Sequence, residues 1–418
     1  MIVREVLGNG LRLLTESMPH VRSISVGVWL TRGSRHEPEP YSGIAHFVEH
    51  MLFKGTSTRS AEDIAQAIDS IGGQLDAFTA KEYASYYIKV LDEHLPLALD
   101  ILSDIVLHPA FDPDDIEREK KVILEEIKMV EDTPDDLVHE LFTQSFWEGH
   151  ALGRPILGTP ETVEALTEQA LRDYFRRVYT ANNLVISAVG NLQHDQVREL
   201  VERSFAEIAA TGDAADDTLP VVVPQFVVRS KDLEQSHICL GTNSYSQSHG
   251  DRYVSYVLNT LLGGSMSSRL FQNVREKRGL AYAVFSGLSA YRDAGALTVY
   301  AGCATEAVGE VIDLTVEELR NVKRTPPPAA ELRRAKDHLK GSLMLSLENT
   351  ASRMSHLARQ EIYFDRQFGL DETLRGVERV TPEDVQRVAA ELFANGGLAG
   401  TVLGPMNGWR LPPERLGL

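Results

Sequence analysis

The chain is poor in cysteine. Its 418 residues include only Cys239 and Cys303. Two cysteines are too few for a disulfide scaffold, and these two do not have the spacing of a metal-ligand pair. We therefore expect both to be buried free thiols in a reducing compartment.

Long hydrophobic runs are also missing. No segment approaches the roughly 18 consecutive apolar residues of a membrane span. The N-terminus begins directly with strand-like alternation, without a basic stretch followed by an apolar one, so nothing in it indicates a secretory signal. A cytoplasmic protein with no membrane span is expected, although a mature form that had already been cut would look the same.

Positive charge is scarce. The 42 basic residues face 60 acidic ones, which gives a formal charge of −18. Nucleic-acid binding is disfavoured, because it requires a positive surface against the phosphates. A negative field favours basic peptides as ligands, but acidity that only aids solubility explains the same composition.

The order of predicted elements occurs twice, about 210 residues apart. In the first half we expect strands at 3–8, 11–15 (around the turn Asn9-Gly10), 22–31, 74–79, 83–91 and 183–190, and helices at 43–53, 61–71, 94–107, 113–133, 135–147, 161–176 and 194–208. In the second half we expect strands at 236–243, 281–287 and 295–302, and helices at 250–262, 266–277, 305–320 and 328–350.

This repeat predicts an α+β protein of two homologous domains, each a mostly antiparallel sheet packed by helices. The segment 209–224 is rich in Ala, Asp, Gly and Pro and is typical of a linker. We place the domain boundary there, with one domain at 1–215 and a homologous domain at 216–418.

One predicted helix carries polar groups on an otherwise apolar surface. The segment from Ser42, a possible N-cap, to Gly55, a possible end, is apolar nearly all round, which is typical of a buried helix. His46, Glu49 and His50 fall within an arc of about 100° on one face. Two imidazoles one turn apart can chelate zinc, and Glu49 beside them can take a proton from metal-bound water. Satisfied core histidines are the alternative.

A catalytic zinc usually has a third protein ligand. The helix at 113–133 has an apolar stripe, with Glu126 and Glu119 on its flank and Glu125 on the opposite, solvent-facing side. Glu126 is therefore the predicted third ligand, and Glu119 the predicted partner that orients His50 or Glu126. A solvated charged face is the alternative for these glutamates.

These residues resemble the pitrilysin/insulinase family of metallopeptidases, with its inverted H-x-x-E-H motif. The likeness is closest to the family's short branch, which includes bacterial processing-protease-like proteins and the β-subunit of the mitochondrial processing peptidase. It extends over nearly the whole chain. The segments that carry it best are SGIAHFVEHMLFKGT (42–56), GGQLDAFTAKEYASYY (72–87), EREKKVILEEIKMVEDTPDD (117–136) and LLGGSMSSRLFQNVREKRGLAYAV (261–284).

The resemblance implies roles for further residues. Arg275 and Tyr282 correspond to an Arg and a Tyr that, in the family, bind the substrate backbone and stabilise the tetrahedral intermediate. By composition alone, Arg275 is a surface charge and Tyr282 a core residue. The family also binds substrate as an added strand, here beside Ala77 and Phe78, which implies an extended or unfolded peptide as substrate.

The sequence therefore predicts a zinc metalloendopeptidase with one Zn²⁺ per chain, in which His46, His50 and Glu126 bind the metal and Glu49 is the base. Because family members enclose substrate between four such domains, the resemblance implies a homodimer, or a heterodimer with a homologue that lacks the motif. The alternative function is a non-catalytic scaffold or core-type subunit of the same fold.

Overall fold

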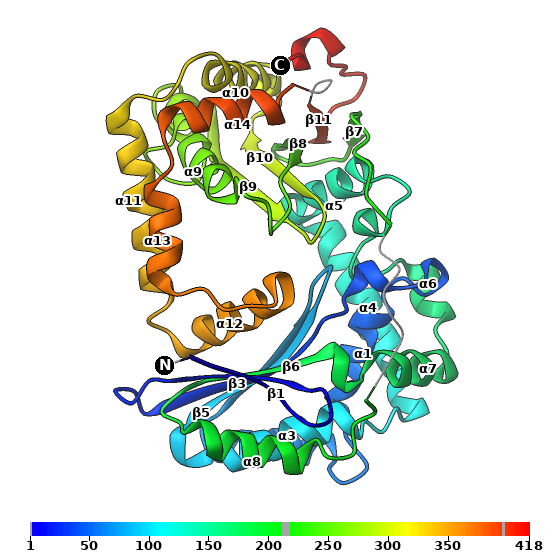
Figure 1. Ribbon diagram of the computed structural model, residues 1–418. Coiled ribbons are helices and arrows are strands. Elements are labelled where there is room, and N and C mark those ends of the chain that lie inside the picture. Colours follow the sequence, from blue (N-terminus) through cyan, green and yellow to red (C-terminus); the bar gives the residue numbers. More distant parts are fainter. Residues whose placement is uncertain (1, 211–217, 395–397) are drawn as a thin grey trace. The chain divides into compact units, whose positions relative to one another are not determined.

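The computed structural model describes residues 2–210, 218–394 and 398–418 (Figure 1). They form two compact units, each assembled from three stretches of chain. The first unit takes its residues from 1–129, 154–217 and 345–367, and the second from 130–153, 218–344 and 368–418. The expected domain boundary at residue 215 lies outside the described residues and stays a prediction.

The first unit contains a six-stranded sheet. Its strands are β1 (Ile2–Val6), β2 (Arg12–Ser17), β3 (Ser23–Leu30), β4 (Gln74–Thr79), β5 (Ala84–Leu91) and β6 (Leu184–Gly190). They lie in the order β1-β2-β6-β3-β5-β4, with β2 and β6 parallel and the other pairs antiparallel. The central strand β6 is buried along its whole length, whereas β4 alternates between exposed and half-buried residues. These burial patterns fit a central strand and an edge strand.

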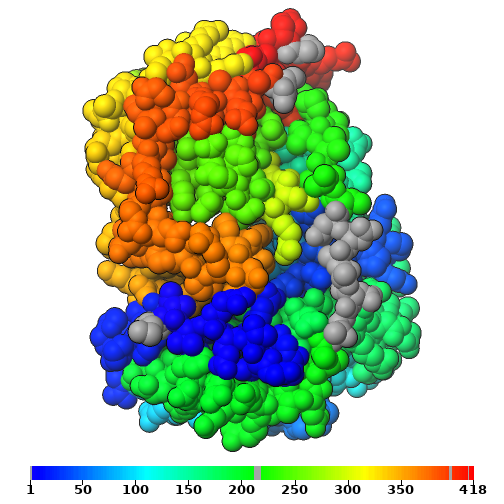
Figure 2. Space-filling model, in the orientation of Figure 1, coloured from blue at the N-terminus to red at the C-terminus, as the bar shows by residue number. Residues whose placement is uncertain are grey.

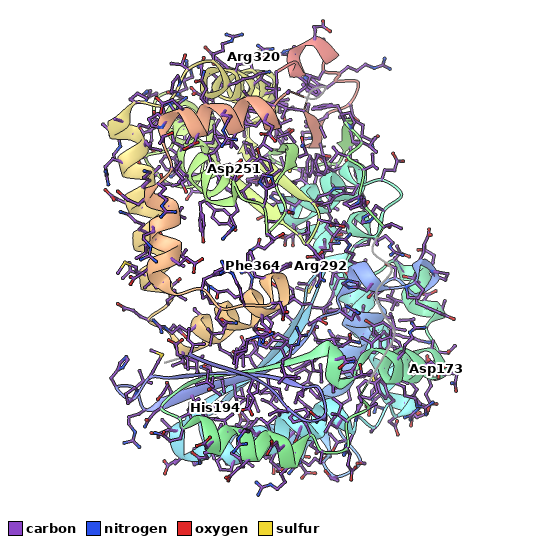
Figure 3. The ribbon with its side chains drawn as sticks, viewed as in Figure 1. Asp173, His194, Asp251, Arg292, Arg320 and Phe364 are labelled. Carbon is purple, nitrogen blue, oxygen red and sulfur yellow. The ribbon has the colours of Figure 1, made fainter. Side chains whose placement is uncertain are left out.

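Helices cover both faces of this sheet. The helices of the first unit are α1 (Ile44–Leu52), α2 (Ala61–Asp69), α3 (Leu95–Leu107), most of α4 (Pro113–Asp132), α6 (Pro160–Ala165), α7 (Glu168–Val178), α8 (His194–Ser204) and α12 (Thr350–Phe364). Helices α3 and α8 pack on one face, and Figure 3 labels His194, the first residue of α8. The His194 ring nitrogens lie 2.9 Å from the Thr15 hydroxyl and 2.9 Å from the Glu5 carboxylate. The predicted helix at 161–176 is two helices, because Thr167 caps a new one by accepting the Ala170 N–H at 3.2 Å.

The other face of the first sheet is covered by α12, which comes from far along the chain. Figure 2 shows this helix (orange) lying beside the N-terminal strands (dark blue). Ser25 and Thr350 are hydrogen-bonded at 2.8 Å, and the Ser187 hydroxyl donates to the Met354 carbonyl at 3.0 Å. Trp29, Met354 and their neighbours form a separate apolar cluster there. Helix α12 therefore supplies a second buried layer that strands β3 and β6 need.

The second unit repeats this plan. Its strands are β7 (Phe226–Ser230), β8 (Ser236–Ser244), β9 (Ala281–Ala290), β10 (Gly295–Cys303) and β11 (Ala399–Gly404), in the order β7-β11-β8-β10-β9. Only the β7–β11 pair is parallel. Its helices are α5 (Pro134–Phe146), α9 (Arg252–Leu262), α10 (Val308–Arg324), most of α11 (Ala329–Ser346), α13 (Leu370–Glu378) and α14 (Pro382–Leu392). Helices α9, α10 and α14 cover one face, and α5 covers the other.

The predicted α+β class, with a helix-packed sheet in each unit, is confirmed. The predicted helix at 266–277 is too long, because helical structure begins at Arg269 after a short irregular stretch and continues as a π-helical segment at Phe271–Glu276. Before this stretch, Gly263 lies against Ser286, where a Cβ on residue 263 would lie 2.4 Å from the Ser286 nitrogen, so the position requires glycine. Cys239 and Cys303 are buried and free, as expected. Among the described residues, no helix is long and apolar enough to cross a membrane.

An ion pair holds α12 to strand β1. Arg4 donates from Nε and Nη2 to the two carboxylate oxygens of Glu361, at 2.8 and 2.9 Å, and the Glu361 side chain is fully buried. Removing one partner of such a pair leaves the other without its strongest hydrogen bonds.

We expect Glu361→Gln to lower the free energy of unfolding by about 1–2 kcal/mol, measured by urea denaturation, because Arg4 loses a buried bidentate partner. Asp365→Asn is the matched control. Asp365 also contacts Arg4, at 2.6 Å, but its side chain is 78% exposed, so the change should cost less than about 0.5 kcal/mol. Equal losses in the two variants would contradict the expected role of Glu361.

Candidate metal centre

Helix α1 is buried among apolar side chains of the first unit. It begins after Gly43, whose φ of +96° suits glycine. The expected cap by Ser42 is wrong: the Ser42 hydroxyl has no hydrogen-bond partner among the described residues. The carboxylate of Glu37 takes its place and accepts the backbone N–H groups of Gly43 and Ala45, at 2.9 and 2.8 Å. A buried acidic side chain therefore fixes where this helix starts.

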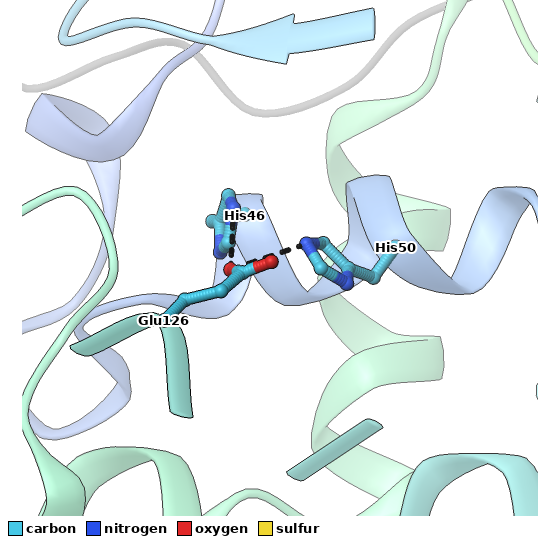
Figure 4. A group of neighbouring side chains, drawn as sticks. All are labelled: His46, His50 and Glu126. Carbon is cyan, nitrogen blue, oxygen red and sulfur yellow. Dashed lines mark ion pairs between the residues drawn. The ribbon is translucent and has the colours of Figure 1, made fainter. Parts of the chain in front are cut away.

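The structure brings His46, His50 and Glu126 together (Figure 4). Their potential ligand atoms lie within 4.8 Å of one another. Oε2 of Glu126 is 3.7 Å from Nε2 of His46 and 3.6 Å from Nε2 of His50. Both distances are too long for a hydrogen bond. They approach the separation of about 3.4 Å between two ligands of a tetrahedral zinc ion.

The donor set suits a cation. Two imidazole nitrogens and one carboxylate oxygen are ligands that zinc prefers. Burial, with a smaller effect of His50, lowers the pKa of His46 to about 3, so its ring is neutral. Among the described residues, Nδ1 of His46 is buried without a hydrogen-bond partner. The three residues thus fit a zinc ion in number, type and spacing.

Glu119 orients one of these imidazoles. Its Oε2 is 2.9 Å from Nδ1 of His50, and its Oε1 is 2.6 Å from Nζ of Lys54. The Glu119 side chain is only 4% exposed, so the alternative that it belongs to a solvated charged face is wrong for this residue. Accepting a proton from Nδ1 leaves the lone pair of His50 on Nε2, which faces Glu126. Sequence reasoning did not predict the contact of Lys54 with Glu119, although Lys54 follows His50 by about one helical turn.

Glu125 lies apart from this centre. It pairs with Lys128 at 2.7 Å, and its side chain is 69% exposed. This position agrees with the solvent-facing side expected for it from helical periodicity.

Glu49 shares the face of α1 that carries both histidines. Its carboxylate accepts a hydrogen bond from the hydroxyl of Thr79. Burial raises the pKa of Glu49, and the Thr79 hydroxyl and His50 partly oppose that shift. Thr79 is the last residue of β4, so it links the carboxylate to the edge strand. Sequence reasoning missed Thr79, although it ends the strand that was expected to bind substrate.

Ala77 and Phe78 lie on β4, the outermost strand of the first sheet. They pair with Tyr86 and Ser85 of β5, and β4 has no strand partner on its other side among the described residues. Phe78 is 37% exposed and meets Trp29 edge-on, with ring centroids 5.7 Å apart. The backbone of β4 is therefore open to a further strand.

Arg275 and Tyr282 lie in the second unit. The guanidinium carbon of Arg275 is 5.0 Å from the centre of the Tyr282 ring and 4.8 Å from that of Phe271. Tyr282 is 79% exposed, so its alternative assignment as a core residue is wrong. The two side chains form a pair at the surface of their unit, and their role toward the centre in the first unit stays a prediction.

Known proteins match the chain over most of its length. Residues 12–160 match the family described as insulinase (peptidase family M16), and residues 165–339 match the peptidase M16 inactive domain. A Bacillus subtilis protein named uncharacterized zinc protease YmxG is 45% identical over 393 residues, which cover 94% of this chain and 96% of the relative. The chain belongs to peptidase family M16.

Other M16 relatives agree. An uncharacterized zinc protease of Mycobacterium tuberculosis is 42% identical over 423 residues, covering 99% of this chain and 95% of the relative. The crystal structure of a protease from Helicobacter pylori has the same fold, with a TM-score of 0.89 at 24% identity, over 96% of this chain and 99% of that one. Both sequence relatives of this M16 chain are thus named zinc proteases, and the solved structure shows the fold.

The word "inactive" in the second description corresponds to a difference between the halves. All candidate metal ligands lie in residues 12–160. In the repeat order, α9 corresponds to α1, and the sequence of α9, RYVSYVLNTLL, contains no His, Cys, Asp or Glu. Helix α9 of this M16 chain therefore has no counterpart of the candidate ligands His46 and His50.

Loss of the third ligand should weaken zinc binding. We expect Glu126→Gln to reduce zinc affinity by about 100-fold or more, because an amide oxygen replaces a charged ligand. Competition with a chromophoric chelator measures the affinity. Glu125→Gln is the matched control on the same helix and should bind zinc as the wild type does. If Glu126→Gln kept wild-type affinity, Glu126 would not be a ligand.

The buried Glu37 should make stability depend on pH. Burial raises its pKa to about 7, although its two backbone N–H donors oppose the shift. The native state then holds a proton that the unfolded state loses above about pH 4.3, so this contribution to stability falls between about pH 4.5 and 7.

We expect Glu37→Gln, in the zinc-free protein, to remove that loss. The free energy of unfolding of the variant minus that of the wild type should rise by up to about 3 kcal/mol from pH 4.5 to 7.5. Urea denaturation at several pH values measures both proteins under identical conditions. A constant difference across this range would contradict a protonated Glu37.

Proposed function

We propose that this chain is a zinc-dependent endopeptidase that cleaves extended or unfolded peptides. The observation that carries the proposal is the convergence of two imidazoles and the Glu126 carboxylate beside a fourth side chain, Glu49, that is free of the ligand set. A purely structural zinc site has four protein ligands, whereas three leave a position for water or substrate. The zinc-protease names of the M16 relatives support the same reaction.

His46, His50 and Glu126 would hold the metal. When bound, zinc supplies a Lewis acid that lowers the pKa of a coordinated water and polarises a carbonyl oxygen. Glu49 accepts the proton of the attacking water and then gives it to the leaving amine, which makes it both general base and general acid. Burial raises the pKa of Glu49, which makes its carboxylate a stronger base. The Thr79 hydroxyl engages one oxygen of Glu49 and orients the carboxylate.

The substrate would add to the first sheet as a strand. Strand β4 offers its outer backbone at Ala77 and Phe78, and Thr79 at its end joins Glu49. Main-chain pairing gives affinity with little sequence preference and needs an extended peptide. The formal charge of −18 favours basic substrates further.

Two groups of the second unit complete the proposal. Arg275 would bind the substrate backbone, and Tyr282 would donate to the oxyanion that forms during attack. The exposure of Tyr282 leaves its hydroxyl available for such a role. Assembly with a second chain, as a homodimer or with a homologue lacking the motif, belongs to the same proposal.

Replacing Glu49 by Gln should separate metal binding from catalysis. We expect Glu49→Gln to keep its zinc and to lose at least about 1000-fold in kcat, because no group then accepts the proton. Cleavage of an unstructured peptide library, followed by mass spectrometry with and without chelator, measures activity and maps the cut sites. Glu125→Gln serves as the active control.

Two results would contradict the proposal. Full activity of Glu49→Gln would remove this residue as the base. Zinc in the wild type without cleavage of any peptide would favour the non-catalytic subunit, the alternative function that shares this fold.

A further inference from the structure

A lysine next to the metal centre has a contact that its sequence position does not reveal. Lys54 is the second residue after α1, and its ammonium lies 2.6 Å from Oε1 of Glu119. The second oxygen of the same carboxylate is 2.9 Å from Nδ1 of His50. A chain of contacts thus runs from Lys54 through Glu119 to a candidate ligand.

This ion pair differs from a surface one. The side chain of Glu119 is 4% exposed, and that of Lys54 is 35% exposed. A buried carboxylate needs partners for both oxygens, because unpaired burial is costly. Among the described residues, Glu119 contacts His50 through one oxygen and Lys54 through the other. Lys54 therefore holds the oxygen that His50 does not use.

The backbone around Lys54 places it against the helix that carries Glu119. Its own N–H donates to the Met51 carbonyl at 3.2 Å, which continues the end of α1. Gly55 then turns with a φ of +117° and accepts the Ala110 N–H at 3.0 Å. Thr56 forms a bridge with Pro109. These contacts tie the end of α1 to the segment just before α4, so the lysine is built into position.

We propose that Lys54 is a positioning residue of the metal centre, which fixes the Glu119 carboxylate so that it holds the His50 ring with Nε2 toward the metal. The inference rests on the proposed function. Without the ammonium, one oxygen of Glu119 loses its partner, and the carboxylate is free to rotate away from Nδ1. The His50 ring then loses its orientation, and the metal loses affinity.

The test compares three variants by zinc affinity, measured by competition with a chromophoric chelator. Lys54→Met keeps the length of the side chain but removes the charge, and we expect about tenfold weaker binding. Lys54→Arg restores a cation and should bind within about threefold of wild type. Lys120→Met is the matched control. Lys120 neighbours Glu119 in sequence but pairs with Glu117 at 2.8 Å, so zinc affinity should not change.

A second readout separates positioning from a folding defect. Peptide cleavage by Lys54→Met should be low when zinc is limiting and should recover when zinc is saturating, whereas a misfolded protein would not recover. Lys54→Gln provides a second uncharged variant if Lys54→Met does not fold. Wild-type zinc affinity in a folded, uncharged Lys54 variant would overturn the inference.

Failure of this inference is distinct from failure of the proposed function. If the wild type binds zinc and Glu49→Gln is inactive, but the Lys54 variants bind zinc normally, only the role of Lys54 is wrong. If the wild type binds no zinc, or if Glu49→Gln is fully active, the proposed function itself is wrong.

Discussion

The candidate centre depends on the burial of one short helix that carries ionisable groups. Helix α1 packs its apolar residues into the core of the first unit, so His46, Glu49 and His50 cannot all turn to water. Each must be satisfied by a group brought from elsewhere. Helix α4 supplies Glu119 and Glu126, and the end of β4 supplies Thr79. These partners satisfy His50 and Glu49, whereas Nδ1 of His46 stays unpaired among the described residues and the potential ligand atoms of His46, His50 and Glu126 are left within 4.8 Å of one another.

Periodicity predicted most of this arrangement. The stripe of α4 placed Glu126 and Glu119 on one side and Glu125 on the other, and the structure agrees at all three positions. The contacts that were missed join residues that share no helix. Glu37 starts α1 from a preceding loop, and Lys54 reaches Glu119 because a glycine turn and a bridge bring α1 to the segment before α4. Such contacts form because the chain turns between the two elements, and the periodicity of a single helix does not predict where the next element packs.

The repeat was visible in the sequence, but the exchange of helices between its halves was not. Helix α5, from the first half, packs on the second sheet, and α12, from the second half, packs on the first. Both are ordinary amphipathic helices, and amphipathicity gives no indication of which sheet a helix will cover. The fully buried pattern of β6 does carry a signal, because a strand buried on both faces requires a layer on each. Among the described residues, α5 packs on the second sheet and α12 provides this layer on the first.

The two halves share largely the same order of strands and helices but differ in the side chains that this order presents. In the first, polar groups on α1 are matched by partners from α4 and β4. In the second, α9 is free of acidic residues and histidines and contributes mainly apolar packing. The second unit instead exposes Tyr282 beside Arg275, and both side chains can donate hydrogen bonds. A hydrolase needs both a site that binds a cation and donors for the developing negative charge. The scaffold that buries α1 also buries α9 without those polar groups, so the same plan holds a candidate metal centre in one half and an exposed donor pair in the other.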